Sequence, residues 1–252
     1  MQNTDTPLLR AAEPGALPNL GQDEIHVWII AVTARRVGDV EGIETLTPAE
    51  RARASRFRSE LNRTSFMQRR AALRMILAGY LEVAPRDIAF TLNEFGKPSV
   101  DAPQGSAAFS FNTSHSGTVA MIALTRSGHI GIDVERLRPL VEAENIAAHF
   151  FTPNEAATLA ALDPRDRVEG FFNAWTRKEA VVKALGGGLS IPLNSFEVSL
   201  RPREPPEILR WDIPSLAPQQ WRIHHLDPVL GYVGALAVDC EASIYRCWKW
   251  PR

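Results

Sequence analysis

The hydrophobic and polar positions along the chain follow two periods. Alternating or β-branched apolar runs predict strands at residues 25–32, 88–92, 108–112, 119–125, 131–135, 221–226 and 232–238. Apolar residues three to four positions apart predict a long helix over 63–81 and another over 175–185, which Gly186 ends. A loop, Ser114-His115-Ser116-Gly117, should join two of the strands. This mixture of elements predicts an α/β (α+β) fold.

The second half of the chain repeats the first. Thr152-Pro153-Asn154-Glu155 has the same helix-start pattern as Thr47-Pro48-Ala49-Glu50, with a capping threonine, a proline at the first helical position and a glutamate that returns to the cap. Residues 117–124 also resemble residues 231–238. We therefore expect two pseudo-symmetric lobes of like topology, each a small sheet with a long helix packed on it. The predicted lobes span 23–127 and 128–252, after a flexible leader at 1–22.

Composition and charge narrow the class of protein. The chain has 252 residues and 45% hydrophobic content, which suffices for a sizeable core. A net charge of -1 predicts no field that attracts nucleic acid or membrane, and no apolar run reaches the length of a membrane span. Two cysteines are too few for a disulfide scaffold, and the first residues lack a signal-peptide pattern. These features predict a cytoplasmic protein. Since two lobes supply their own cleft, we also expect a monomer.

Three carboxylates are candidates for a metal-binding site. Asp133 and Glu135 share one face of a predicted strand, and Glu179 and Lys183 share one face of a predicted helix. Such carboxylates could hold a hard cation such as Mg²⁺, which leaves room for water and substrate phosphates, and the lysine could bind those phosphates. The same pattern also fits an ordinary ion pair one helical turn apart and the wet side of an amphipathic strand.

Several common catalytic motifs are missing from the sequence. No Gly-x-Ser-x-Gly elbow is present, and Ser114 and His115 are neighbours that rarely face each other, so we do not expect a hydrolase triad. Neither a Walker-type loop nor a Gly-x-Gly-x-x-Gly motif occurs. The glycines at 186–188 follow a helix, so they lack the helix N-terminus that a phosphate loop uses.

Five motifs, in order, give the chain a family resemblance over residues 46–200. It resembles the 4′-phosphopantetheinyl transferases, in the larger two-lobed class that activates nonribosomal peptide and polyketide synthases. The matching stretches are Phe95-Gly96-Lys97-Pro98, Phe111-Asn112-Thr113-Ser114-His115-Ser116-Gly117, Ile132-Asp133-Val134-Glu135, Phe150-Phe151-Thr152-Pro153-Asn154-Glu155, and Trp175-Thr176-Arg177-Lys178-Glu179-Ala180-Val181-Val182-Lys183 with Gly187-Gly188-Leu189.

The resemblance implies a reaction and a metal. The 4′-phosphopantetheine arm of coenzyme A would pass to a serine of an acyl or peptidyl carrier protein domain, with release of 3′,5′-ADP. The cofactor would lie in the cleft between the lobes. Asp133, Glu135 and Glu179 are the expected ligands of Mg²⁺, with Mn²⁺ as an alternative.

The resemblance also implies roles for single residues. Glu179, Glu155 and a metal-bound water remain alternatives for the base that activates the serine, and the role of Lys178 stays open. Lys183 should lie near the pyrophosphate, in a catalytic and a cofactor-binding role. The other expected coenzyme A contacts are Arg53, Arg70, Lys97, Ser114 and His115.

Two further questions stay open at the level of sequence. The arginine-rich segment 51–74 could bind cofactor phosphates, dock the acidic helix of a carrier domain, or form a solvated helix face. A non-catalytic coenzyme A or carrier-protein binding module of the same fold is the alternative function. A binder has no need of the three carboxylates, which favours the enzyme.

Overall fold

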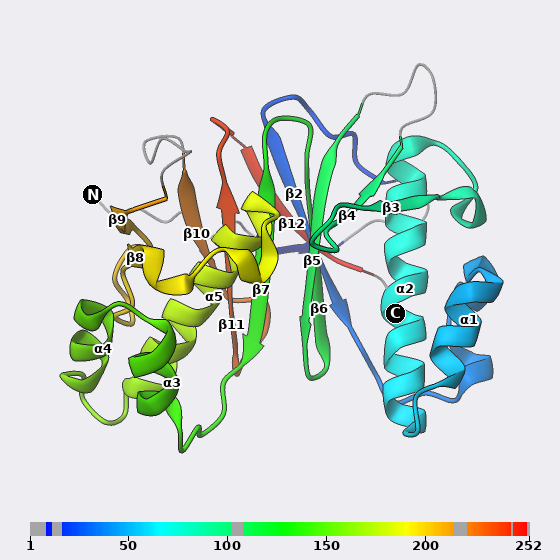
Figure 1. Cartoon of the computed structure of the whole chain (residues 1–252). Coiled ribbons are helices and arrows are strands. Elements are labelled where there is room, and N and C mark those ends of the chain that lie inside the picture. Colours follow the sequence, from blue (N-terminus) through cyan, green and yellow to red (C-terminus); the bar gives the residue numbers. More distant parts are fainter. Residues whose placement is uncertain (1–8, 12–16, 102–107, 214–220, 243, 251–252) are drawn as a thin grey trace.

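Two β-sheets meet in the middle of the molecule, and a long helix packs against each (Figure 1). The computed structural model describes residues 9–11, 17–101, 108–213, 221–242 and 244–250, so most of the predicted leader lies outside the described residues. The first sheet has the order β1 (Leu9–Ala11), β12 (Ile244–Lys249), β2 (Glu24–Ala31), β6 (Val119–Thr125) and β5 (Ser110–Ser116). The second has the order β10 (Arg222–Leu226), β11 (Tyr232–Val238) and β7 (Ile130–Arg136).

Two hairpins, five α-helices and five short 3-10 helices complete the regular structure of the described residues. The hairpins are β3 (Phe90–Leu92) with β4 (Pro98–Val100), and β8 (Phe196–Val198) with β9 (Ile208–Trp211). The helices are α1 (Pro48–Ser55), α2 (Glu60–Leu81), α3 (Ala143–Phe150), α4 (Pro153–Ala160) and α5 (Arg167–Leu185). In the described part of the chain, no helix is both long and apolar enough to cross a membrane.

The predicted repeat is confirmed at the start of α1 and α4. Both helices begin with a complete capping box, in which threonine and glutamate satisfy each other's backbone N–H groups. Each capping glutamate also pairs with a basic side chain of the long helix that follows: Glu50 with Arg74 at 2.8 Å, and Glu155 with Lys178 at 2.8 Å. The predicted α+β fold is therefore confirmed, and the helix starts of the two halves are alike.

The two sheets are joined by side chains of β5. Asn112, Ser114 and Ser116 accept hydrogen bonds from the backbone N–H groups of β7 residues Ile132, Val134 and Arg136, at 3.0, 3.3 and 3.1 Å. These side chains replace the carbonyl oxygens that would join neighbouring strands of one sheet. The seam between β5 and β7 therefore fixes the two halves of the molecule in one register.

The structure corrects one predicted loop and adds a strand near the C-terminal end of the described chain. Residues 114–116, which we expected in a loop, continue strand β5, and the turn is confined to Gly117, at φ +53°, and Thr118. The strand continues because residues 114–116 pair with residues 119–121 of β6, and its serine side chains also bond to β7. The aromatic C-terminal tail forms β12, which runs parallel to β2 in the first sheet. The division into lobes at 127 and 128 stays a prediction.

Candidate active site

Helix α5 lies directly on strand β7 at Gly131. A Cβ at this position would overlap the carbonyl oxygen of Ala180 and the backbone of Ala184, so only glycine permits so close an approach. The contact brings the α5 face that carries Glu179 and Lys183 against the β7 face that carries Asp133.

Asp133 is the centre of the site. It is 4% exposed, and its Oδ1 accepts hydrogen bonds from Lys183 Nζ at 2.6 Å and from Ser114 Oγ at 2.7 Å. Its buried Oδ2 has no hydrogen-bond partner among the described residues. Lys183 therefore pairs with Asp133 and not with Glu179, the partner expected from an ordinary ion pair one helical turn apart. A buried carboxylate oxygen without a partner is an open acceptor for a cation or a proton donor.

Glu135 and Glu179 complete an acidic group. Glu135 Oε2 accepts a hydrogen bond from Ser116 Oγ at 2.7 Å, whereas the side-chain carboxylate of Glu179 forms no hydrogen bond or ion pair with any described residue. Burial raises the pKa of both carboxyls, and the negative charge of Asp133 raises each further, while Lys183 acts in the opposite direction. A cation placed among the three carboxylates would relieve this repulsion.

The donor set fits a hard divalent cation such as Mg²⁺, which prefers carboxylate oxygens and water. The unpartnered Oδ2 of Asp133 supports that fit. In the described part of the chain, however, no three acidic, histidine or cysteine side chains already have the spacing that holds a metal ion. Metal binding would therefore require small side-chain movements of Glu135 or Glu179.

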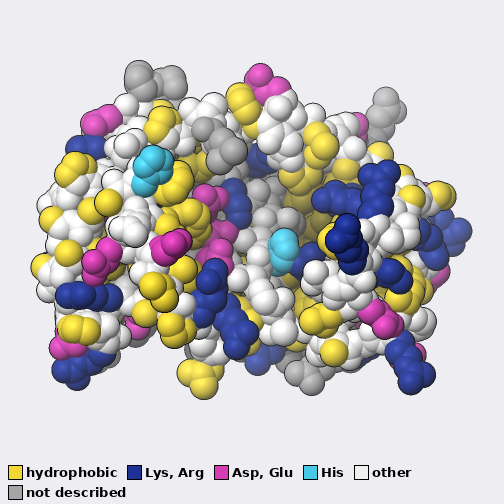
Figure 2. Space-filling model, turned by 60° about the horizontal axis from the view of Figure 1, so that its bottom comes forward, with side chains coloured by type: hydrophobic (Ala, Val, Ile, Leu, Met, Phe, Trp, Pro, Cys, Tyr) yellow, Lys and Arg dark blue, Asp and Glu magenta, His cyan; other side chains and the backbone are white. Residues whose placement is uncertain are grey.

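A basic pocket of about 200 Å³ lies across the seam, between α1, α2 and β5. It brings together four of the residues expected to contact coenzyme A, namely Arg53, Arg70, Ser114 and His115. Figure 2 shows the hollow between the two halves, with acidic side chains gathered on one side and basic side chains on the other.

Arg69 also lines this pocket, although the sequence pointed to it only as one member of the arginine-rich segment 51–74. It makes no hydrogen bond or ion pair with any described residue, and burial lowers its pKa to about 10. Arg70, by contrast, pairs with Glu50 and lies 3.8 Å from the centre of the Phe90 ring. The helical spacing could have identified Arg69, because it stands one turn after Phe66, another lining residue.

Lys97 lies outside that pocket. Its Nζ donates hydrogen bonds to the carbonyl oxygens of Ala184 at 2.9 Å and Ile130 at 3.2 Å, at the end of α5 and the start of β7. Burial lowers its pKa to about 8, against the opposing charge of Asp239. The structure therefore places Lys97 against α5 and β7, the elements that carry the carboxylates. It does not bring Lys97 into the basic pocket with Arg70.

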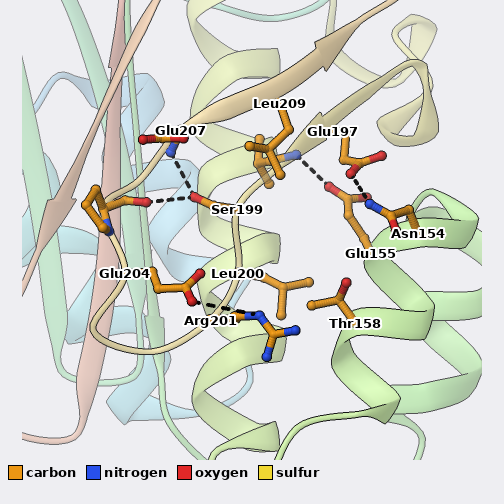
Figure 3. A pocket seen from close by; sticks show the side chains of 12 residues that line it. Asn154, Glu155, Thr158, Glu197, Ser199, Leu200, Arg201, Glu204, Glu207 and Leu209 are labelled. Atoms are coloured by element: carbon orange, nitrogen blue, oxygen red, sulfur yellow. Dashed lines mark hydrogen bonds and ion pairs between the residues drawn. The ribbon is translucent and has the colours of Figure 1, made fainter.

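Glu155 is held in a different part of the second half. It is 2% exposed, it accepts hydrogen bonds from the backbone N–H groups of Thr152 and Val198, and it pairs with Lys178. Figure 3 shows it in the wall of a pocket of about 270 Å³, with Glu197 beside it. Lys178 also donates to two main-chain oxygens, those of Leu193 and Phe196. The structure does not bring Glu155 into contact with Asp133.

Comparisons with known proteins agree with this arrangement. A family model described as the 4'-phosphopantetheinyl transferase superfamily matches residues 129–237, and one described as 4'-phosphopantetheinyl transferase, N-terminal, matches residues 40–127. The chain is 36% identical over 223 residues to 4'-phosphopantetheinyl transferase HetI of Nostoc sp., which covers 88% of this chain and 91% of the relative. It is 33% identical over 156 residues to 4'-phosphopantetheinyl transferase Sfp of Bacillus subtilis, over 62% of this chain and 66% of the relative.

Proposed function

Because the chain belongs to the 4′-phosphopantetheinyl transferase family, we propose that it transfers the 4′-phosphopantetheine arm of coenzyme A to a serine hydroxyl of acyl or peptidyl carrier protein domains, with release of 3′,5′-ADP. One observation carries the proposal: a basic pocket and a group of three carboxylates face each other across one seam. A substrate with a phosphate at one end and a pyrophosphate in its middle suits such a pair of sites. The non-catalytic alternative is not favoured by the comparisons.

The basic pocket is suited to the 3′-phosphate of coenzyme A. Arginine binds phosphate through charge-assisted and often paired hydrogen bonds. Arg69 is available for them, because it has no partner among the described residues. Arg53 and His115, both exposed at the pocket, can add donors as the ligand enters.

The carboxylates are suited to a divalent cation, and we assign Asp133, Glu135 and Glu179 as the residues that would hold Mg²⁺ or Mn²⁺. When bound, such an ion would neutralise charge on the pyrophosphate during transfer. Ser114 and Ser116 orient the two strand carboxylates, since each donates its hydroxyl proton to one of them. Lys183, which touches Asp133, lies where it can bind the same pyrophosphate.

For the base that accepts the serine proton we favour Glu179. It is partly exposed and free of hydrogen bonds within the described chain, so an incoming hydroxyl can reach it. Glu155 is fully engaged by its capping box and by Lys178, which supports a structural role for both. General-base catalysis requires hydrogen-bond contact with the reacting hydroxyl.

We further propose that one chain is sufficient, because a single protomer supplies both the pocket and the carboxylates. The free thiols of Cys240 and Cys247 suit a reducing compartment such as the cytoplasm.

The test is the intact mass of an apo carrier domain after incubation with this protein, coenzyme A and Mg²⁺. We expect a gain of roughly 340 Da, the mass of one phosphopantetheine. In a parallel incubation with EDTA, which removes the metal, we expect no gain in mass. No gain on acyl and peptidyl carriers alike would overturn the proposed transfer. An EDTA-resistant gain would preserve the transfer and remove the metal assignment.

A further inference from the structure

The turn between β3 and β4 binds the end of helix α5, although the two lie far apart in sequence. Asn93 Nδ2 donates a hydrogen bond to the carbonyl oxygen of Gly186 at 2.9 Å. Lys97 Nζ donates to the carbonyl oxygens of Ala184 at 2.9 Å and Ile130 at 3.2 Å. Two side chains from the first half of the molecule therefore hold main-chain atoms of the second half.

These acceptors are chemically suited to the contact. The last carbonyl groups of a helix have no partner within it, and they carry the negative end of the helix dipole. Gly186 ends α5 at φ +74°, so the chain leaves the helix and exposes the carbonyl oxygens around it. A lysine ammonium and an amide N–H₂ are the donors that such a terminus accepts.

The turn itself is shaped for the contact. Asn93 Oδ1 accepts hydrogen bonds from the backbone N–H groups of Phe95 at 3.0 Å and Lys97 at 2.8 Å. Gly96 adopts φ +84°, a conformation that glycine tolerates best. One oxygen of Asn93 thus fixes the turn, while its nitrogen is directed at α5.

We propose that Asn93 and Lys97 form a clasp that sets the position of α5 on β7, and so places Glu179 and Lys183 against Asp133. Both are positioning residues in this role, because they act through α5 and the start of β7. Gly131 lets α5 and β7 touch, and the clasp fixes where along β7 they touch. The inference rests on the proposed function of the carboxylates and Lys183.

The clasp requires Asn93, whereas a role of Lys97 in binding the phosphates of coenzyme A would not. Substitutions of Asn93 therefore distinguish the two. Asn93→Asp is the sharpest variant, because it keeps the oxygen that fixes the turn and removes the N–H donor to Gly186. It also places a negative charge at the negative end of α5. Glu94→Gln, an exposed neighbour in the same turn, is the matched control.

The test measures steady-state transfer and amide hydrogen exchange together. For Asn93→Asp we expect kcat to fall roughly 5-fold or more while KM for coenzyme A stays within about 2-fold, since misplacement of reacting groups lowers kcat. Exchange should rise in peptides that cover the end of α5 and stay unchanged in β6. Glu94→Gln should match the unsubstituted protein in both measurements.

Three results would overturn the clasp: unchanged kcat, a raised KM with unchanged kcat, or faster exchange over the whole protein. If Asn93→Asp does not fold, Asn93→Ser must give the same split, and its failure to do so counts equally against the proposal. The proposed transfer is tested by the activity of the unsubstituted protein alone. An unsubstituted protein without activity would contradict the proposed function, whereas an active protein with unchanged kcat in Asn93→Asp would contradict only the clasp.

Discussion

Asp133 receives two donors on one carboxylate oxygen and none on the other. At the scale of single residues this asymmetry defines the site, because it leaves one oxygen open beside Lys183. Neighbours of equal charge lie close by, so removal of one carboxylate changes the electrostatics of the whole group.

Asp133→Asn should lower transfer by about 100-fold or more, because it removes the central charge that would hold the metal and face Lys183. The measurement is initial rate of holo-carrier formation, with circular dichroism to verify the fold. Asp87→Asn, at an exposed site, is the control. Full activity of the Asp133 variant in Mg²⁺ would remove the metal assignment.

Arg69→Ala should raise KM for coenzyme A by about 10-fold, because a charge-assisted contact to phosphate is lost. The same substitution should affect dephospho-coenzyme A much less, since that substrate lacks the 3′-phosphate. Kinetics with both substrates decide the matter, and the exposed Arg86→Ala serves as control. An equal rise in KM for both would contradict a 3′-phosphate contact.

At the scale of elements, the packing of α5 on β7 brings the residues of the site together. The backbone-to-backbone approach at Gly131 allows no side chain, so the helix cannot move outward without losing its buried face.

Gly131→Ala should reduce the free energy of unfolding by about 2–3 kcal/mol, because the added Cβ forces α5 away from β7. Transfer should also fall, since Glu179 and Lys183 move with α5. Urea unfolding measures the first effect and initial rates the second. Gly38→Ala, where a Cβ meets nothing within 4 Å, should change stability by less than about 0.5 kcal/mol. Equal effects of the two substitutions would contradict this account.

The elements also show what the sequence could reveal. Local chemistry predicted both capping boxes and the end of α5 at Gly186, because a threonine cap or a glycine stop depends on nearby residues alone. The loop predicted at 114–117 was wrong, since the serines are satisfied by β7 and not by their neighbours. The partners of Lys97 are also distant in sequence, so no local pattern could identify them.

At the scale of the whole molecule, the first sheet joins strands from the two ends of the described chain, because β12 lies between β1 and β2. His26 of β2 lies beside this junction: its Nε2 is 3.1 Å from Glu24, its Nδ1 is 2.7 Å from the Tyr80 hydroxyl, and its ring meets the edge of Trp248. Arg246 of β12 binds the same Glu24 at 3.0 Å. Burial lowers the pKa of His26 to about 4, with Glu24 opposing and Arg246 and Arg126 reinforcing the shift.

Stability should therefore fall in mild acid. At pH values between about 4, the pKa of His26 in the folded protein, and 6.5, its ordinary value, His26 is protonated in the unfolded chain and neutral in the folded protein. Acid therefore favours unfolding. We expect a loss of about 2 kcal/mol in the free energy of unfolding between roughly pH 7.5 and pH 5. Urea unfolding at both values measures it. His26→Gln, which cannot titrate, should show a flatter profile, and identical profiles for both proteins would contradict the assignment.

The pairing of β12 with β2 has a consequence for synthesis. Arg246 and Glu24, which bind across these strands, are 222 positions apart. A ribosome that adds about 5–20 residues per second completes β2 many seconds before β12, its neighbour on one side, exists. The first half of the nascent chain thus waits with an open strand edge, a form that invites mispairing. Chaperones that cover such edges should act on this protein during translation, and an early stop codon should leave a fragment that aggregates rather than a folded half.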